Sequence, residues 1–552
     1  MDRYSIGLDF GTESGRALLV NVGTGEELGS VERRYRDGVI TEYLPGTNCR
    51  LDPQWALQNP ENYLDVIFSA IPELLSKSGV SRSHIISLGV AFTSCTVLPV
   101  DSSGTPLCLI DEFRDHPHSW VKLWKHHAAI EEAEIMERLL RQQDPHWLAR
   151  YGHHVSVEWL WPKLLEVLQE DPVIFSATDR FVEAADWIVY QLTGQWSRNI
   201  GGAGFKAFFQ DDLPPVESIF AAQFPQLAHV TETKLRGPVV SIATSVGQIR
   251  PGIARSIGLS ADTVVAAGMI DAHAAVLGSR GIGSDTMTLV MGTSTCHLVL
   301  HDRLTETEGI FGVVKDGLIP GQFAYEAGQP AVGDLLAWVV GLQPANRDGD
   351  PYEELENETA LMAPGQSGLL CMDWWNGNRS VLGDESLSGA VLGLRLNTSV
   401  ADVYRGAMES TAFGTRRIIQ AFEEAGLGCE HLVAGGGLPY KSTVLMQIYA
   451  DVTGRKIEVA SSRQSTALGA AVAAAVAAGP KLGGYTNISD AVRAMVPAAP
   501  HTVIPNPEAH RTYDQLYQHY MRVHDWLGRM EPQIMHDLLS IRQGTIRRKS
   551  VR

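Results

Sequence analysis

The chain has 552 residues, of which 44% are hydrophobic and 20% charged, as in an ordinary globular protein with large cores. Its length alone predicts roughly two to four domains. Acidic residues outnumber basic ones by 63 to 45, and the net charge of −18 argues against a nucleic-acid-binding protein, which needs a basic face. An anionic ligand is not excluded, because a few backbone amides can bind one locally.

The six cysteines are scattered and form neither a CxxC pair nor a zinc-site spacing, so we expect free thiols. The first residues, Met1 to Tyr4, lead directly into a predicted strand, so we expect no signal peptide. The most apolar stretch, residues 467–479, is mostly alanine and too short to span a bilayer. We therefore expect a soluble cytoplasmic protein with no membrane partner.

The N-terminal segment alternates between apolar and polar residues over Tyr4–Phe10, turns at 11–15, and returns over Arg16–Val22. A third run, Leu28–Tyr35, completes a predicted antiparallel meander. The first turn is rich in Gly, Thr and Ser, and its successive amides could bind an anion. A plain hairpin with no ligand is the alternative.

A helix follows, with Asn59 as its cap, Pro60 at its first position and Gly79 at its end. A buried strand, Ile85–Phe92, precedes a hairpin predicted to pair Val97–Val100 with 106–110. The helical period predicts a buried stripe made of Leu64, Ile67, Phe68, Ile71, Leu74 and Leu75.

The segment 116–127 combines aromatic and basic side chains, and we predict that it forms one wall of a pocket for a polar ligand. Its histidines lack a metal-site spacing, so we expect no metal there. The glycine-rich stretch 201–207 carries Lys206 and matches neither a P-loop nor a dinucleotide fingerprint. Its alternative interpretation is a flexible connector with a solvated lysine.

Asp271 follows a strand-like run, 263–267, and precedes an alanine-rich helix that extends to Gly278. A carboxylate at the end of a strand is where α/β folds often place their chemistry. The simpler alternative is a helix N-cap, in which the aspartate only accepts backbone N–H groups.

The segments 7–20 and 288–300 repeat one pattern: a strand, a turn beginning with Gly-Thr, and a second strand. The repeat predicts two similar domains, each presenting amides and hydroxyls at a hairpin. Asp9 of the first copy stands opposite Val290 of the second. A carboxylate on one side only suits a site between the domains, with a cation near Asp9.

Three later stretches are weaker signals. The loop 373–379 is polar and aromatic, and a turn packed by its own tryptophans is as good an interpretation as a ligand role. A strand, 429–434, runs into Gly435-Gly436-Gly437 and then into a helix from about Ser442, the outline of a phosphate or nucleotide site. The stretch 507–527 is predicted to be an amphipathic helix.

Four of these features occur in one order: Asp9-Phe10-Gly11-Thr12, Asp271, Gly292-Thr293-Ser294 and Gly435-Gly436-Gly437. Together with the segment 393–409, they resemble the FGGY carbohydrate kinases over roughly residues 4 to 530. The resemblance implies an α/β fold of two actin/hexokinase-like (ribonuclease H-like) domains with a catalytic cleft between them. It also implies an N-terminal domain at 1–278, a C-terminal nucleotide-binding domain at 279–500, and a helical extension and tail at 501–552.

The resemblance further implies transfer of the γ-phosphoryl group of ATP, with Mg²⁺, to a sugar hydroxyl whose proton Asp271 accepts as general base. The metal would lie near Asp9 and Asp271, the latter through water. The residues implied for the sugar are Ser94, Trp124, Lys206, Asp271 and Glu326. Those implied for the nucleotide are Gly11, Thr12, Gly292, Thr293, Gly436 and Gly437.

Within the family, the blocks at 121–127, 204–206, 326–329 and 373–379 are most similar to the kinases that phosphorylate L-ribulose at its terminal hydroxyl. The sequence departs from that pattern at Ala91, where Asp is common, at Pro330, where Ser is usual, and at Ser442, where Asn is common. Those departures leave sugar preference and nucleotide selectivity open.

The expected partners are a ketopentose and ATP, with a homodimer left open. Two other functions remain alternatives: a kinase for another ketopentose or polyol, such as D-ribulose, xylulose or glycerol, and a weakly catalytic regulator that binds sugar and ATP. A chaperone-like ATPase of the same superfamily is disfavoured, because no peptide-binding β domain follows the second lobe.

Overall fold

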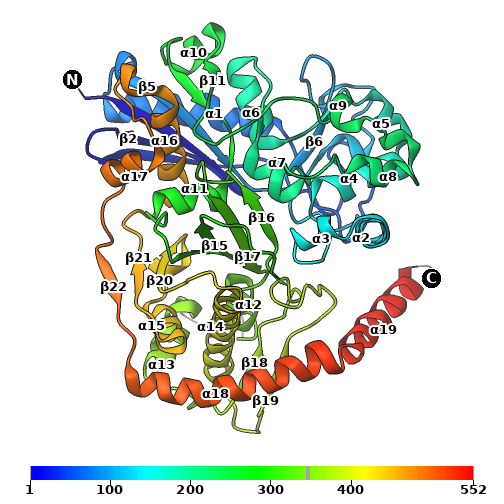
Figure 1. The fold of residues 1–552 in the computed structure, drawn as a ribbon, viewed down its shortest axis with the longest axis vertical. Helices are drawn as coiled ribbons and strands as arrows, with labels where there is room; N and C mark the ends of the chain where they lie inside the picture. The colour runs from blue at the N-terminus through cyan, green and yellow to red at the C-terminus, as the bar shows by residue number, and fades with distance from the viewer. Residues whose placement is uncertain (1, 308, 344–348, 551–552) are drawn as a thin grey trace.

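The computed structural model describes residues 2–307, 309–343 and 349–550, with side chains described as far as Arg542. Two twisted sheets form the centres of two halves of the molecule, which lie one above the other in Figure 1. The predicted fold class, a two-domain α/β fold, is confirmed. None of the helices in the described part of the chain has both the length and the apolar composition required to cross a bilayer.

The first sheet contains a meander joined to parallel strands, with one antiparallel strand at its edge. A short strand, β13, pairs with β5 beyond the end of β12. In spatial order the strands are β11 (Ser245–Gln248), β12 (Val264–Ala266), β5 (Ile85–Phe92), β1 (Tyr4–Phe10), β2 (Ser14–Asn21) and β3 (Glu27–Arg34), with β13 at Met269–Ile270.

The second sheet repeats this strand order and adds one strand, β16, beside its meander. Its strands are β16 (Gly312–Lys315), β17 (Phe323–Gln329), β15 (Thr295–His301), β14 (Thr286–Met291), β20 (His431–Gly435), β21 (Ile457–Val459) and β22 (His501–Val503).

The predicted internal repeat is therefore confirmed, because β1 and β14 occupy equivalent places between an antiparallel and a parallel neighbour. The two hairpins differ in length by one residue. The first pairs Phe10 with Gly15 across its turn, whereas the second pairs Met291 with Thr295. Gly11 and Gly292 still begin the two turns, as the sequence repeat requires.

Helices cover both faces of the first sheet, as Figure 1 shows. Side chains of β2 alternate between the two cores: Leu19 packs with one set of helices and Leu18 with the other. The first set is α1 (Glu61–Ser78), α6 (Ala184–Thr193) and α10 (Pro251–Ile257); the second is α11 (Asp271–Gly278), α16 (Ser465–Ala478) and α17 (Ile488–Met495).

A lobe inserted into the first half surrounds a small four-stranded sheet, seen at the right of Figure 1. Its strands are β4 (Leu57–Gln58), β7 (Val121–Lys122), β6 (Val97–Val100) and β8 (Arg180–Glu183), and β9 (Arg198–Asn199) pairs separately with β10 (Val239–Val240). Its helices are α2 (Ile130–Gln143), α3 (His146–Ala149), α4 (Leu160–Glu170), α5 (Pro172–Ala177), α7 (Ile200–Lys206), α8 (Glu217–Ala221) and α9 (Val230–Thr233).

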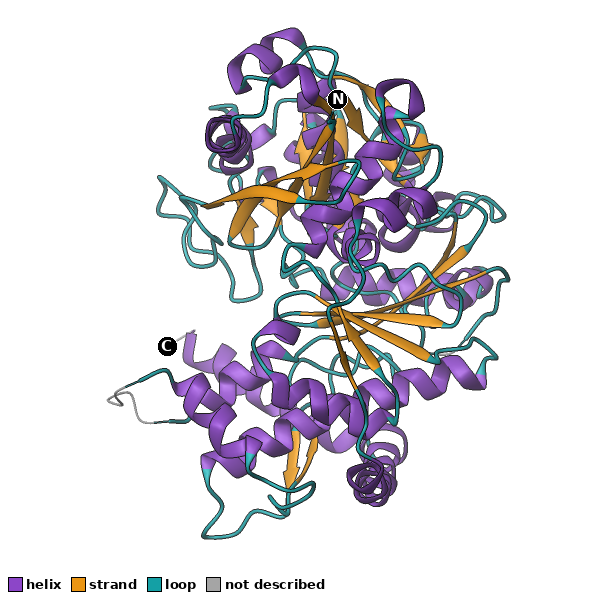
Figure 2. Cartoon of the chain, turned by 90° about the vertical axis from the view of Figure 1, so that its left-hand side faces the viewer, coloured by secondary structure: helices purple, strands orange, loops and turns teal. Residues whose placement is uncertain are grey.

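In the second half, a long buried helix, α14, packs against α15 and α12, and its Ser399–Asp402 capping box fixes where it begins. The view in Figure 2 shows these helices beside the second sheet. The elements are α12 (Gly333–Val340), α13 (Pro351–Ala360), α14 (Val400–Glu424), α15 (Thr443–Thr453), α18 (Pro507–Asp525), α19 (Gln533–Ser550) and the hairpin of β18 (Leu370–Met372) and β19 (Ala390–Leu392).

The helix α16 crosses back from the second half and lies on the first sheet, where backbone meets backbone. A Cβ on Gly7 of β1 would lie 1.8 Å from the carbonyl oxygen of Ala467, and one on Gly89 of β5 would lie 2.0 Å from that of Ala470. These contacts require glycine, because any side chain would have to push a helix off the sheet. The helix α16 therefore belongs to the second half by its place in the chain and to the first half by its packing.

Three local predictions are wrong in whole or in part. In the predicted stripe of α1, Ile67, Ile71 and Leu74 are buried as expected, but Leu64 and Leu75 are only half-buried and Phe68 is 40% exposed. Tyr63, Val66 and Ala70 complete the buried face. The predicted pairing of Val97–Val100 with 106–110 is reduced to one antiparallel bridge, Val100 with Pro106, because Leu107–Leu109 form a short 3-10 turn. The strand β6 pairs with β7 and β8. The glycine-rich stretch at 201–207 is not a flexible loop, because it forms the buried helix α7.

The six cysteines, all within the described part of the chain, are free thiols as predicted. The predicted amphipathic helix at 507–527 is α18, which buries Tyr513, Tyr517 and Tyr520 against the core of the second half.

Candidate active site between the two halves

Asp271 is the first residue of α11, immediately after the short strand β13. The N-cap position belongs to Ile270, and the Asp271 carboxylate accepts only from the adjacent Ala272 N–H, at 2.7 Å. The N-cap alternative is therefore wrong. Burial, followed by repulsion from Asp9, raises the pKa of Asp271 to about 7. Such a carboxyl group can exchange a proton near neutral pH.

The position of Asp271 is fixed by close contact between α11 and α16. A Cβ on Gly278 would lie 1.8 Å from the carbonyl oxygen of Ser465, and one on Gly469 would lie 1.7 Å from that of Ala274. The two helices therefore touch through their backbones, which leaves α11 little freedom to shift.

Asp9 lies near the end of β1, where its carboxylate is 3.6 Å from Arg16 Nε. Burial raises the pKa of Asp9 to about 6, although Arg16 opposes the shift. Ala91 is its register partner on β5, with Met269 of β13 on the other side, and is completely buried. The departure at Ala91 thus falls directly beside the carboxylate that the resemblance assigns to the metal.

Lys206, Glu326 and His273 form a buried polar cluster that joins the two halves. Lys206 Nζ lies 2.5 Å from Glu326 Oε1, and His273 Nε2 lies 3.3 Å from Glu326 Oε2. Burial alone would raise the pKa of Glu326, but Lys206 and His273 hold it well below its ordinary value. Lys206 is not the solvated lysine of the alternative interpretation: α7, capped by Asn199, places it inside the molecule.

This cluster acts electrostatically on Asp271: Glu326 raises the pKa of that carboxyl group and Lys206 lowers it. Burial lowers the pKa of His273, which keeps its imidazole neutral, and its Nδ1 atom is buried without a partner. The structure thus brings three of the predicted residues into one electrostatic neighbourhood. His273 joins them, although the sequence indicated no role for it.

The first Gly-Thr turn is held by three side chains. Tyr35 OH donates to the carbonyl of Gly11 at 3.0 Å, and Gln58 Nε2 donates to that of Thr12 at 2.7 Å. Trp124 Nε1 donates to Thr12 Oγ1 at 3.0 Å, so a residue predicted for the sugar is tied to the turn predicted for phosphate.

The second Gly-Thr turn packs against the beginning of α12. Gly333 N–H donates to the carbonyl of Gly292 at 3.1 Å, and Val332 N–H donates to that of Thr293 at 2.9 Å. Gly436, with φ +88°, follows β20, where its Cβ would lie 2.4 Å from the carbonyl oxygen of Met291. The predicted phosphate turn and the glycine run therefore lie side by side, at the ends of the neighbouring strands β14 and β20.

Ser442, the third departure, caps α15, as its hydroxyl accepts from Leu445 N–H at 3.0 Å. The same hydroxyl donates to the carboxylate of Glu356 at 2.7 Å. The side chain thus links α13 to α15 next to the glycine run.

A cleft of about 920 Å³ opens between the halves. Trp124, Lys125 and His127 line it, as predicted for the 116–127 wall, whereas Trp120 and His126 of the same segment are buried. The departure Pro330 lies on the opposite wall.

An ion pair crosses the cleft, with Arg379 2.6 Å from Glu158 Oε1. Burial would raise the pKa of Glu158, but Arg379 and His127 lower it to about 2. Arg379 belongs to the polar-aromatic loop, which combines both of its interpretations: Trp374 is core and Asp373 binds Gln329 and Tyr520, whereas Arg379 reaches the cleft. Glu158 carried no sequence signal.

Ser94 is half-buried in the turn between β5 and β6, next to Cys95, whose φ is +55°. No contact places it on a ligand, so its role remains a prediction.

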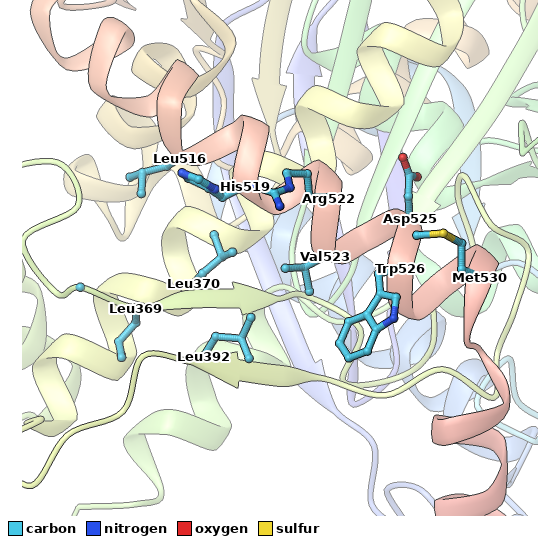
Figure 3. A pocket seen from close by; sticks show the side chains of 11 residues that line it. Leu369, Leu370, Leu392, Leu516, His519, Arg522, Val523, Asp525, Trp526 and Met530 are labelled. Carbon is cyan, nitrogen blue, oxygen red and sulfur yellow. The ribbon is translucent and has the colours of Figure 1, made fainter.

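Two other features lie outside this site. The apolar groove in Figure 3 runs between α18 and the β18–β19 hairpin, and none of the predicted site residues lines it. Among the described residues, His118, Glu166 and Glu170 have the spacing for a metal ion. However, Glu166 already pairs with Lys122 at 3.0 Å, and a metal would have to displace that cation.

Comparison with protein families matches residues 4–278 to the N-terminal domain, and 287–478 to the C-terminal domain, of the FGGY family of carbohydrate kinases. A protein named "Ribulokinase" from Anoxybacillus flavithermus is 47% identical over 97% of this chain and 96% of its own length. "Ribulokinase" of Geobacillus thermodenitrificans is 48% identical over the same shares, and that of Mycolicibacterium smegmatis is 42% identical over 100% and 98%.

Solved structures share the fold at lower identity. Xylulose kinase from Rhodospirillum rubrum superimposes with a TM-score of 0.78 at 22% identity, over 97% of this chain and all of the other. Plasmodium falciparum glycerol kinase with ADP gives a TM-score of 0.72 at 14% identity, over 94% and 98%. Two matched domain models and full-length curated relatives establish that this chain belongs to the FGGY family of carbohydrate kinases.

Proposed function

We propose that this kinase transfers the γ-phosphoryl group of ATP to the terminal hydroxyl of L-ribulose, giving L-ribulose 5-phosphate. The full-length similarity to proteins named "Ribulokinase" supports the choice of sugar. The observation that carries the chemistry is the Asp271 carboxyl group, set at the start of α11 with its pKa raised to about 7.

Asp271 acts as the general base. A sugar hydroxyl is a weak nucleophile, and a carboxylate within hydrogen-bond reach assists it by accepting its proton as it attacks. Efficient transfer needs a base whose pKa lies near the working pH, which burial and Asp9 provide here. Phosphoryl transfer needs mainly positioning and charge stabilisation, so no covalent nucleophile is required.

The sugar lies against Trp124 and Ser94, with Lys206 and Glu326 providing the charged hydrogen-bonding groups. Lys206 and Glu326 bind each other from opposite halves, at 2.5 Å. A sugar hydroxyl that hydrogen-bonds to both would connect the two halves when it binds. Sugar binding would thereby be coupled to the position of the second half. Closure of the two halves around the sugar keeps water from competing with it for the phosphoryl group of ATP.

The nucleotide phosphates lie between the two Gly-Thr turns, Gly11-Thr12 and Gly292-Thr293, whose amides and hydroxyls are suited to anionic oxygens. Gly436 and Gly437 flank the adenosine. Gly436 already touches the end of β14, so the adenosine and phosphate sites would be continuous.

The residues present fit Mg²⁺. Repulsion from Asp9 raises the pKa of Asp271, so a cation near both carboxylates would be favourable. Arg16, 3.6 Å from Asp9, compensates part of the Asp9 charge and would share that carboxylate with the ion. Carboxylate oxygens are the ligands that Mg²⁺ prefers. Asp9 would hold the ion, with Asp271 reaching it through water, and the bound ion would neutralise phosphate charge.

We also keep as proposals the division into 1–278, 279–500 and 501–552, a cytoplasmic location and a homodimer. Light scattering on purified protein tests the last of these directly.

The test of the activity is an ADP-release assay with L-ribulose, D-ribulose, D-xylulose and glycerol. We expect the highest kcat/KM with L-ribulose; a preference for glycerol or D-xylulose would contradict the substrate. Asp271→Asn should lower kcat by about 10²- to 10⁴-fold, whereas the exposed Asp262→Asn should not. An unchanged sugar-dependent rate in Asp271→Asn would contradict the role of the base.

A further inference from the structure

A buried lysine on α4 joins the two loops that the sugar site needs. Lys163 has no exposed surface, and its Nζ lies 2.7 Å from the carbonyl oxygen of Cys95 and 2.8 Å from that of Leu123. Cys95 follows Ser94, and Leu123 precedes Trp124. One ammonium group therefore binds the backbone next to each of two residues assigned to the sugar.

Both carbonyls belong to irregular backbone, outside the strands β5, β6 and β7. Cys95 lies in the turn between β5 and β6 with φ +55°, a left-handed conformation that costs energy for a residue with a side chain. Leu123 lies just beyond the end of β7. The Leu123 carbonyl also accepts from His126 N–H at 2.9 Å, so Lys163 adds a second hydrogen bond there. At Cys95 the same ammonium group, with its three N–H donors, gives a partner to a buried carbonyl that would be costly to leave without one.

The lysine itself is expensive to bury. Burial lowers the pKa of Lys163 to about 8, although Cys95, Glu158 and Glu183 oppose the shift. An apolar side chain of similar size would fill the same space without that desolvation cost. The hydrogen bonds to the two carbonyls explain why a charged lysine, and not an apolar residue, stands at this position.

The next turn of α4 attaches the Trp124 segment a second time. Glu166 pairs with Lys122 Nζ at 3.0 Å and with His126 Nε2 at 3.0 Å, and all three side chains are fully buried. Lys122 and His126 stand on either side of Trp124, which donates to Thr12. Both Lys163 and Glu166 therefore attach α4 to the segment that carries Trp124. Of these two residues, Lys163 is the one that also binds the turn next to Ser94.

We propose that Lys163 is a positioning residue for the sugar, which sets the Ser94 turn and Trp124 at a fixed separation. The proposal rests on the proposed function and extends it to a residue that is not assigned to the substrate or nucleotide. Because Lys163 acts through the sugar wall, its removal weakens sugar binding more than ATP binding.

The test compares Lys163→Met, which removes every donor, and Lys163→Gln, which keeps a neutral one, with wild type. Lys234→Met is the matched control, since Lys234 also donates to a carbonyl, that of Thr178, away from the cleft. We expect Lys163→Met to raise the KM for sugar by about 10- to 100-fold, as for an ångström-scale misplacement. Lys163→Gln should fall between Lys163→Met and wild type, and the KM for ATP should change by less than about twofold in both.

Sugar binding measured by calorimetry without ATP should weaken by the same factor, which separates positioning from a loss of turnover. An equal rise in both KM values, or an unchanged sugar affinity in Lys163→Met, would overturn the proposal. If Lys163→Met does not fold, Lys163→Gln decides by the same criteria.

The sugar used is the best wild-type substrate in the panel. If L-ribulose is not the substrate, the wild-type kcat/KM values across the panel show it. If Lys163 does not position the sugar, the ratio of the variant's KM for sugar to that of wild type shows it.

Discussion

The two hairpins that open the halves share their strand pairing and differ in their chemistry. β1 ends with Asp9 next to its turn, whereas β14 has Val290 at the equivalent place. Asp271 and Lys206 also lie in the first half, and the second contributes Glu326 to the same neighbourhood. In the proposed site, a duplicated scaffold concentrates charge in one copy and leaves mainly backbone groups at the turn of the other.

The largest expected effect comes from breaking the link between the halves. Lys206→Met leaves Glu326 buried without its closest cation, and losing one partner of such a pair typically costs about 3–5 kcal/mol. We expect a large drop in the free energy of unfolding, measured by urea titration, and a raised KM for sugar.

The double variant Lys206→Met/Glu326→Leu is its control, because removing both charges should recover part of the stability. If the double variant is no more stable than Lys206→Met, the account of this pair is wrong.

A smaller effect follows from removing the asymmetry at β1. Asp9→Asn should lower Mg²⁺ affinity, read from the metal dependence of kcat, by about 10- to 100-fold, because in the proposed site this carboxylate holds the ion. Adding Val290→Asp to this variant should not restore it, since Val290 stands opposite Cys296 whereas Asp9 stands opposite Arg16. A full rescue by Val290→Asp would mean that the two hairpins are interchangeable.

The second half is tested through its backbone. Gly436→Ala must accommodate a φ of +88° and a Cβ 2.4 Å from the Met291 carbonyl oxygen, whereas Gly437→Ala meets open space. We expect Gly436→Ala to raise the KM for ATP by about tenfold, with a stability cost of about 1–3 kcal/mol, and Gly437→Ala to preserve stability. Equal stability of the two variants would contradict the contact with β14.

The smallest effect is a displacement of the pH profile. The proposed mechanism requires ionised Asp271, so kcat/KM should rise with pH through about 7, where burial and Asp9 place its pKa. Asp9→Asn removes a repelling charge and should move this limb to lower pH, by about one unit. Ala91→Asp adds a carboxylate beside Asp9 and should move it upward. Shifts in the opposite directions would contradict the assignment of the limb.

Much of this asymmetry was predictable because it lies in short local motifs. Asp9, Asp271 and the two Gly-Thr turns stand in strand-turn patterns that a single sequence displays. Lys206 was harder to interpret. Its glycines resemble a loop, yet Gly204 is required by packing, since its Cβ would lie 2.5 Å from Val314 of the other half. Tertiary contact there overrides the low helix propensity of glycine.

The features that prediction missed depend on contacts between distant segments. Glu158, just before α4, and Lys163, on α4, acquire their roles from Arg379, Cys95 and Leu123, and no local periodicity distinguishes them. Similarly, β6 was predicted to pair with the segment just after it, but a single bridge, Val100 with Pro106, forms there, and β8, far along the chain, pairs with the whole of β6. The buried face of α1 includes Ala70 and Tyr63, which a count of large apolar residues leaves out. Ala70 is small enough for close packing, and the Tyr63 hydroxyl can be buried because it donates to Gln58.

The central claim is that Asp271 accepts the sugar proton during phosphoryl transfer, and a single-turnover rapid-quench measurement tests it most directly. With ATP, Mg²⁺ and saturating L-ribulose, wild type should show a transfer rate that rises with pH through the pKa of Asp271, which the ion lowers from the value of about 7 that burial and Asp9 set without it. Asp271→Asn should transfer about 10²- to 10⁴-fold more slowly, without that pH dependence. A variant that keeps the wild-type rate and the same pH limb would contradict the claim.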